Sequence, residues 1–414
     1  MKILITNIKE LVQTENGERR KKVSGTDMAD VSSIKDAFLL IEDGLISDFG
    51  KMDDISDDQQ KKAVELDATG RFVFPSFCDS HTHLVFPKTR EIEYVDKIKG
   101  LSYEEIAKRG GGILNSAQST RDISEDQLFE DALKRSEEII EMGTGAVEIK
   151  SGYGLDTEQE LKLLRAAKRL KQESPLTIKS TFLGAHAIPP KFKKDQSKFV
   201  DIIVNEMLPA VAEENLADFV DVFCDRGFFT VESTERILEE AKKYNLPPKI
   251  HANELDYSGG IQAGVKYNAL SVDHLEYTGE KEIEALKNSD TMPTVLPGAA
   301  FFLNLKYAPA REMIDAGLPV AMASDFNPGS SPSGNMQLIL SMASILYKLT
   351  PQEAINAVTL NSAYAMGVES DLGSIAKGKK ANLFITKEIP TMEFMPYYYG
   401  TNKVDKVILN GELI

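Results

Sequence analysis

Five histidines, the residue type best suited to both metal binding and proton transfer, all fall where a short apolar segment ends. They are His81, His83, His186, His251 and His274. His81 and His83 stand two residues apart in the sequence Asp-Ser-His-Thr-His. Alternate residues of a strand face the same way, so both imidazoles can reach one metal ion. A His-x-His pair is common by chance, however, and predicts a metal site only together with further ligands.

Two later residues extend the pair of His81 and His83 to a complete ligand set. His251 lies at the end of the fifth of eight apolar segments, and Asp325 follows the eighth. Alone, His251 would be an ordinary core histidine and Asp325 a turn or N-cap aspartate. Together, three imidazoles and one carboxylate suit zinc or iron, and the residue types do not separate these two metals.

One ion is expected at this site rather than a pair of ions. The fourth apolar segment runs into Phe-Cys-Asp at residues 223–225 and offers no lysine that could be carboxylated to bridge two metals. Lys150 ends the second segment, where a structural or substrate-facing role fits it better than a bridging role. The sequence therefore predicts a mononuclear centre.

A metal ion in this position would make water a nucleophile for hydrolysis. A bound ion lowers the pKa of its water toward neutrality, so that hydroxide can attack a carbonyl carbon. Asp325 can then receive the proton, and His274 is placed to hold the water or polarise the carbonyl group. Glu254, three residues past His251, can pass a proton to a departing nitrogen. The alternatives are a buried structural histidine for His274 and an exposed loop glutamate for Glu254.

Eight short segments rich in apolar and β-branched residues must position these side chains. They cover residues 73–78, 146–150, 178–183, 219–224, 249–252, 270–274, 292–296 and 320–324. Helical spacing separates them, as in Leu163, Ala166 and Leu170, and Thr157 with Glu160 has the pattern of a capping box. Strand and helix alternating eight times predict a (β/α)8 TIM barrel, whose catalytic groups come from the carboxyl ends of its strands.

Both ends of the chain depart from this alternation. Residues 1–68 and 368–414 contain short strands and turns, for example residues 382–386 and 403–409. The strands after residue 368 are too short to form a domain alone. We predict that the two ends together build a small β-sandwich domain beside a catalytic barrel of residues 69–367.

Composition and charge limit the partners of this chain. Hydrophobic residues make up 42% and charged residues 27%, as in ordinary globular proteins. The net charge of −16 argues against nucleic acid and anionic membranes as partners, so a small anionic substrate would need a local basic group. No apolar run approaches the roughly 18 to 20 residues that cross a membrane. The two cysteines, Cys78 and Cys224, are expected to be reduced thiols of a cytoplasmic protein.

Longer motifs around the candidate residues resemble those of the imidazolonepropionases, within the amidohydrolase superfamily. The matching segments are residues 75–86 (PSFCDSHTHLVF), 110–113 (GGGI), 148–155 (EIKSGYGL), 182–187 (FLGAHA), 221–225 (DVFCD), 249–254 (KIHANE), 272–276 (VDHLE), 296–299 (LPGA) and 324–332 (SDFNPGSSP). The superfamily shares the His-Thr-His and the aspartate, whereas SGYGL, FLGAHA and DFNPGSS are more specific. The chain departs from the pattern at Ser76, where glycine is common, and at residues 87–89, which replace a small, glycine-containing approach to Arg90.

The resemblance implies a metal-dependent hydrolase that acts on a cyclic amide in histidine degradation. The reaction would open a ring C–N bond of 4-imidazolone-5-propanoate and give N-formimino-L-glutamate. The implied metal ligands of one Zn or Fe ion per subunit are His81, His83, His251 and Asp325, the same residues chosen above. The implied substrate contacts are Arg90, Tyr153, His186, Glu254, Asn327, Gly329 and Ser330.

These contacts are chemically reasonable for the implied substrate. Arg90 offers a bidentate fork for the propanoate carboxylate. His186 and Glu254 can bond opposite edges of the ring, and His186 joins Asp325, His274 and Glu254 as a candidate catalytic residue. A homodimer is implied by the resemblance alone.

Two other readings keep part of this pattern. A different amidohydrolase, such as a guanine or cytosine deaminase or a formiminoglutamate deiminase, would keep the metal ligands but lack Arg90 with Tyr153 as a carboxylate clamp. A metal-binding protein without catalysis could keep four ligands but has no reason to retain Glu254, His274 and Arg90 around them.

Overall fold

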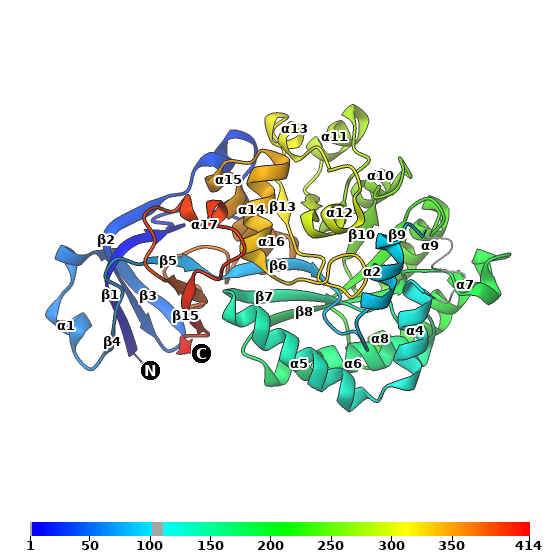
Figure 1. Cartoon of the computed structure of the whole chain (residues 1–414), viewed down its shortest axis with the longest axis horizontal. Coiled ribbons are helices and arrows are strands. Elements are labelled where there is room, and N and C mark those ends of the chain that lie inside the picture. The colour runs from blue at the N-terminus through cyan, green and yellow to red at the C-terminus, as the bar shows by residue number, and fades with distance from the viewer. Residues whose placement is uncertain (1, 102–110) are drawn as a thin grey trace.

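The computed structural model describes residues 2–101 and 111–414 and consists of a barrel and a smaller β domain (Figure 1). Figure 1 shows the blue and red ribbons, which are the two ends of the chain, together to the left of the barrel. Gly110, the first residue of the GGGI motif, lies outside the described residues. The sequence motifs with candidate ligands all lie in the barrel half.

Within the described residues, eight strands form one parallel sheet in chain order. They are β6 (Phe77–Thr82), β7 (Thr144–Lys150), β8 (Thr177–Ala185), β9 (Phe219–Cys224), β10 (Pro248–Ala252), β11 (Ser271–His274), β12 (Met292–Val295) and β13 (Ala321–Met322). A parallel bridge between Thr82 and Phe326, and a hydrogen bond of 3.0 Å from the Asp325 amide to the His81 carbonyl, join the last strand to the first. The predicted (β/α)8 barrel is confirmed.

Helices surround the barrel, and most of them bury apolar residues that recur at helical spacing. They are α2 (Glu91–Ile98), α4 (Ile113–Asp122), α5 (Glu125–Glu141), α6 (Thr157–Glu173), α7 (Gln196–Ile202), α8 (Leu208–Glu213), α9 (Val231–Ala241), α10 (Gly260–Lys266), α11 (Glu280–Lys287), α12 (Pro297–Leu303), α13 (Ala310–Asp315), α14 (Met336–Tyr347), α15 (Pro351–Val358) and α16 (Leu360–Ala365). In α6, for example, Leu163, Ala166 and Leu170 are buried. This apolar face packs the helix against β8.

Both ends of the chain together build the smaller domain, as predicted, and its strands form one mixed sheet. Its strands, in sheet order, are β16 (Glu412–Leu413), β15 (Val404–Leu409), β14 (Leu383–Thr386), β5 (Phe72–Pro75), β1 (Lys2–Val12), β2 (Ser33–Glu42) and β3 (Leu45–Lys51), with β4 (Val64–Asp67) paired to β1. The sheet forks at β1, where Asn7 has a φ of 53° and the register shifts. The first half of β1 therefore pairs with β4 and the second half with β5.

The chain passes from the small sheet into the barrel at Ser76. Residues 73–78 were expected to form the first barrel strand, but residues 72–75 form β5 and pair with β14 of the small sheet. The barrel strand β6 begins at Phe77. Both strands are fully buried, so the apolar pattern does not mark the passage between them. We therefore propose Ser76, rather than residue 69, as the first residue of the barrel domain, and keep residue 368 as the proposed second boundary.

Candidate metal centre and active site

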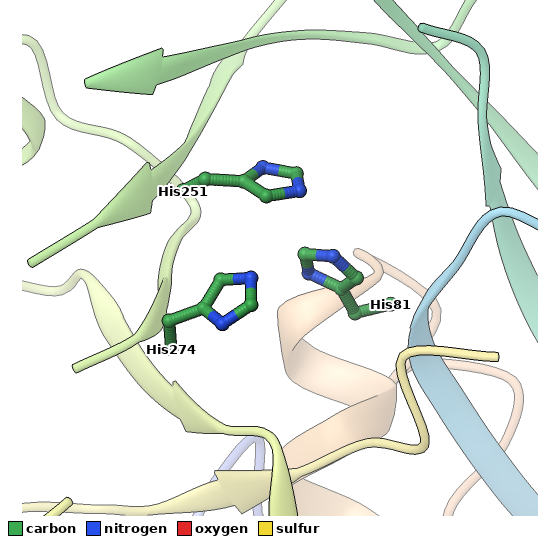
Figure 2. Close-up of side chains that lie close together, drawn as sticks. All are labelled: His81, His251 and His274. Atoms are coloured by element: carbon green, nitrogen blue, oxygen red, sulfur yellow. The ribbon is translucent and has the colours of Figure 1, made fainter. Parts of the chain in front are cut away.

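The five histidines come together at the carboxyl ends of the barrel strands. His81 lies in β6, His251 in β10 and His274 at the end of β11. Their ring centres are 4.5 Å apart for His81 and His251 and 5.2 Å apart for His251 and His274. Figure 2 shows these three rings turned toward a common space. The rings of His83 and His186 stack on each other beside His251, with ring centres 5.0 Å apart.

Asp325 completes this cluster from the end of the last strand. Its Oδ1 lies 3.5 Å from Nε2 of His81 and 3.8 Å from Nε2 of His83. Its φ of 54° is in the left-handed region that residues other than glycine rarely occupy. Asn327 Nδ2 donates to the Asp325 carbonyl at 2.7 Å, and Ser330 Oγ donates to Asp325 Oδ2 at 3.3 Å. The turn that contains Asn327 and Ser330 therefore aims the carboxylate at the histidines.

The cluster offers ligand atoms that suit a bound cation. Three groups have ligand atoms within 4.8 Å of one another: His81, His251 and His274; His83, His186 and His251; and His81, His83 and Asp325. Every pair of the predicted ligands occurs in one of these groups except His251 with Asp325. Among the described residues, Nε2 of His81 and Nε2 of His251 are buried without a hydrogen-bond partner. Such atoms are costly to bury alone, and a metal ion would satisfy them.

Each predicted histidine ligand is oriented through its other ring nitrogen. His81 Nδ1 lies 2.7 Å from Asp273 Oδ2, and His251 Nδ1 lies 3.0 Å from Asp221 Oδ2. His83 Nδ1 lies 3.2 Å from the Ser151 carbonyl oxygen. Because these oxygens accept, each Nδ1 carries the proton and Nε2 is free to bind a metal. His274 has no such bond, since its Nδ1 is 3.8 Å from Glu254 Oε2. This difference favours His83 over His274 as the third nitrogen ligand.

Burial favours the neutral form of four of the imidazoles, and metal binding requires that form. Burial lowers the pKa of His81, His83 and His274 well below the usual value, with neighbouring charges adding to the effect. It lowers the pKa of His186 to about 3. The same burial raises the pKa of Asp325 to about 6.

His274 and Glu254 face each other from neighbouring strand ends. Leu275 and His274 both have left-handed backbones, with φ of 74° and 83°. The Leu275 amide donates to the Ala252 carbonyl at 3.1 Å, so the turn after β11 is fastened to the end of β10. Burial raises the pKa of Glu254, and the charge of Asp325 raises it further. The raised pKa favours the protonated form of Glu254.

A pocket of about 770 Å³ opens over the cluster. Its walls include apolar side chains such as Phe223, Phe228 and Leu305. All seven predicted substrate contacts line it: Arg90, Tyr153, His186, Glu254, Asn327, Gly329 and Ser330. An apolar cavity with a few converging polar groups is typical of a small-molecule site.

Arg90 is the cation that the predicted carboxylate clamp requires, and its neighbours hold it in place. An ideal Cβ on Gly329 would lie 1.6 Å from Arg90 Nη2, so a side chain at this position would displace the guanidinium group. Glu93 Oε2 lies 3.3 Å from Arg90 Nε. Glu93 also accepts hydrogen bonds from the Gly112 amide and Asn115 Nδ2, at 2.9 Å and 2.8 Å. Glu93 was not among the residues predicted from the sequence, although its spacing of three residues from Arg90 on a helix was a usable signal.

The loop that carries Tyr153 is held by a buried carboxylate. Glu160 accepts hydrogen bonds from the Gly152, Gly154 and Leu155 amides at 2.9, 2.7 and 2.9 Å. The predicted capping box of Thr157 and Glu160 is wrong. Asp156 caps α6 instead, through a 3.0 Å hydrogen bond from the Gln159 amide. Glu160 is thereby left to fix the loop beside His186.

Comparison with known proteins identifies the family. Residues 72–414 match the sequence model of the Amidohydrolase family. The imidazolonepropionase of Christiangramia forsetii is 52% identical over 417 residues, which cover 100% of both chains. The imidazolonepropionase of Flavobacterium johnsoniae is 53% identical over 99% of each chain, and that of Thermoanaerobacter pseudethanolicus is 45% identical over 98% of this chain and 96% of its own. The chain belongs to the imidazolonepropionase family. The family resemblance inferred from the motifs is therefore confirmed along the whole chain.

Solved structures of more distant amidohydrolases share the fold. A guanine deaminase from C. acetobutylicum with bound guanine has a TM-score of 0.72 at 15% identity, covering 100% of both chains. An atrazine chlorohydrolase from Arthrobacter aurescens TC1 complexed with zinc has a TM-score of 0.73 at 17% identity, covering 99% of this chain and 94% of the other. At such low identity these structures support the fold alone. The comparison of function therefore rests on the imidazolonepropionase relatives.

Proposed function

We propose that the chain is a metal-dependent hydrolase that converts 4-imidazolone-5-propanoate to N-formimino-L-glutamate in histidine degradation. Full-length kinship to imidazolonepropionases supports this activity. The main structural support for this activity is the cluster of oriented imidazoles and one carboxylate, which lies in a pocket that also contains a guanidinium group. Hydrolysis adds water across the ring amide, so the carbonyl carbon becomes a carboxylate and the ring nitrogen gains a proton.

One zinc or iron ion per subunit, held by His81, His83, His251 and Asp325, would lower the pKa of water enough for attack near neutral pH. The proton from the attacking water goes to Asp325, whose carboxylate faces the histidines. His274 polarises the ring carbonyl group. Glu254 delivers a proton to the departing nitrogen, so that the C–N bond breaks without releasing an anionic nitrogen.

Substrate orientation is assigned to the remaining pocket residues. Arg90 pairs with the propanoate carboxylate, and Tyr153 lies beside His186 with ring centres 5.4 Å apart. The turn of Asn327, Gly329 and Ser330 borders the same end of the pocket as Arg90. Together these contacts hold the ring carbonyl toward the metal-binding cluster.

Replacement of Arg90 by methionine should raise KM by about 10- to 100-fold, the effect expected when a hydrogen bond to a charged group worth about 1.5 to 3 kcal/mol is lost. Methionine keeps much of the side-chain volume but cannot pair with a carboxylate. We expect kcat to change little, because Arg90 lies away from the reacting bond. Steady-state kinetics measure both constants.

Lys97→Met is the matched control, since Lys97 lines the same pocket and its Nζ donates to the Phe302 carbonyl at 3.3 Å. Its KM should stay within about threefold of the parent value. A propanoate amide of the substrate should bind both the parent and Arg90→Met equally weakly. An unchanged KM in Arg90→Met would remove Arg90 from the clamp.

Product analysis separates ring opening from the deaminase alternative. Purified protein should convert imidazolonepropanoate to N-formimino-L-glutamate without releasing ammonia, and it should leave guanine and cytosine unchanged. Mass spectrometry and an ammonia assay distinguish these outcomes. Ammonia release from guanine or cytosine, without ring opening of imidazolonepropanoate, would contradict the proposed function.

The partner of this function is the small-molecule substrate. None of the helices in the described part of the chain is long and apolar enough to cross a membrane. A homodimer is proposed on family kinship, and a cytoplasmic location is proposed because both cysteines are buried free thiols.

A further inference from the structure

Buried charged side chains form a connected cluster inside the barrel, outside the pocket that holds the substrate. Lys150 Nζ donates to Glu148 Oε1 at 2.6 Å and to Asp221 Oδ2 at 2.7 Å, and it lies 3.5 Å from Asp273 Oδ2. Lys249 Nζ contacts the other carboxylate oxygen of Glu148. The side chains of all five residues are 0% exposed. No solvent therefore screens these charges.

This cluster is connected directly to two of the predicted metal ligands. Asp221 and Asp273 are the carboxylates that accept the Nδ1 protons of His251 and His81. One ammonium group thus lies against both of the aspartates that orient histidines. The three carboxylates around Lys150 would repel one another without it. Although burial alone would lower the pKa of Lys150, Asp221 and Glu148 raise it, so the ammonium group keeps its charge.

We propose that Lys150 is a positioning residue for metal binding, which acts through Asp221 and Asp273 on His251 and His81. The ammonium group holds one oxygen of each aspartate at the place from which it accepts the imidazole proton. The two Nε2 atoms then point into the shared space without any rearrangement when a metal arrives. This inference rests on the proposed function only in taking His81 and His251 as metal ligands.

The loss of Lys150 should act on metal affinity rather than on the fold alone. Two buried carboxylates without their shared cation would turn toward other donors, and their hydrogen bonds to Nδ1 would weaken. The imidazole rings would then be free to rotate away from the metal position. Partners of this kind behind a metal ligand typically contribute about 10- to 100-fold to metal affinity.

Lys249 provides a matched control inside the same cluster. It is equally buried, carries the same charge and shares Glu148 with Lys150. Its other hydrogen bonds go to the carbonyl oxygens of Ser80 and Ala365, at 3.0 Å and 3.1 Å, and not to an aspartate that orients a histidine. Substitution of either lysine should disturb folding in a similar way, but only Lys150 should affect metal binding strongly.

The test compares two double variants, Lys150→Met/Glu148→Gln and Lys249→Met/Glu148→Gln, each of which removes one positive and one negative charge. This pairing avoids an uncompensated buried charge, which could unfold a single variant. Metal-free protein is titrated with Zn²⁺ in competition with a chromogenic chelator, and the Tm of the metal-free forms is measured in parallel.

We expect the Zn²⁺ Kd of the Lys150 double variant to rise about 10- to 100-fold and that of the Lys249 double variant to change less than about threefold. The Tm values should fall by similar amounts. Equal Kd changes in the two variants, or no change in the Lys150 variant, would overturn the inference. A Lys150 variant that fails to fold while the Lys249 variant folds would also overturn it, because Lys150 would then be a structural residue. A different reaction product would refute the proposed substrate but leave the difference in Kd intact.

Discussion

Asp325→Ala should lower kcat by about 10⁴-fold, the upper end of the range for the loss of a general base. Two effects combine in this variant, because Asp325 is the proposed proton acceptor and also the only carboxylate among the four proposed ligands. Its Oδ1 faces Nε2 of both His81 and His83 at 3.5 Å and 3.8 Å. Pre-steady-state and steady-state assays of the purified variant would measure the loss.

Metal loss must be separated from loss of the proton acceptor in this experiment. The variant should be assayed with zinc added in excess, and its bound metal should be measured directly. We expect added zinc to restore metal occupancy but not turnover. Full recovery of kcat with zinc would show that Asp325 only retains the metal and does not receive the proton.

Glu254→Gln is expected to lower kcat by about 10²- to 10⁴-fold while KM stays within about tenfold of the parent value. Glutamine fills the same volume but cannot deliver a proton to the departing nitrogen. The parent enzyme should lose kcat as the pH rises through the elevated pKa of Glu254, because the acid form is the active one. The variant should lack this decline at high pH, and a pH series of kcat measures it.

Glu276→Gln is the matched control for this prediction. Glu276 is also a buried glutamate near His274, with Oε2 4.0 Å from His274 Nδ1, but it does not line the pocket. Its kcat should fall less than about tenfold. If Glu276→Gln lost activity as severely as Glu254→Gln, the proton donor would have to be reassigned.

The barrel and most of the candidate site could be predicted from sequence because strand ends carry the chemistry. Each of His81, His251 and His274 closes or lies within an apolar segment that is a barrel strand, and parallel strands bring their carboxyl ends to one face. Asp325 could be predicted as a further ligand because it also follows the end of a barrel strand. Conversely, two adjacent buried strands, β5 and β6, share one apolar run, so the passage at Ser76 gave no signal in hydrophobicity.

The contacts that orient the ligands could not be predicted because they join distant parts of the chain. Asp273 is 192 residues from His81, and nothing in their spacing reveals the 2.7 Å between Oδ2 and Nδ1. Glu160 matched a local capping pattern, but tertiary structure used it to bind the Tyr153 loop. Local patterns thus identify the reactive side chains, and packing between strands determines how they are held.

Anomalous X-ray diffraction from crystals of the metal-loaded protein would locate the ion and identify its ligands. We expect one ion per chain at about 2.0 to 2.2 Å from Nε2 of His81, His83 and His251 and from the Asp325 carboxylate. Two ions per chain, or one ion bound by His274 in the absence of Asp325, would contradict it.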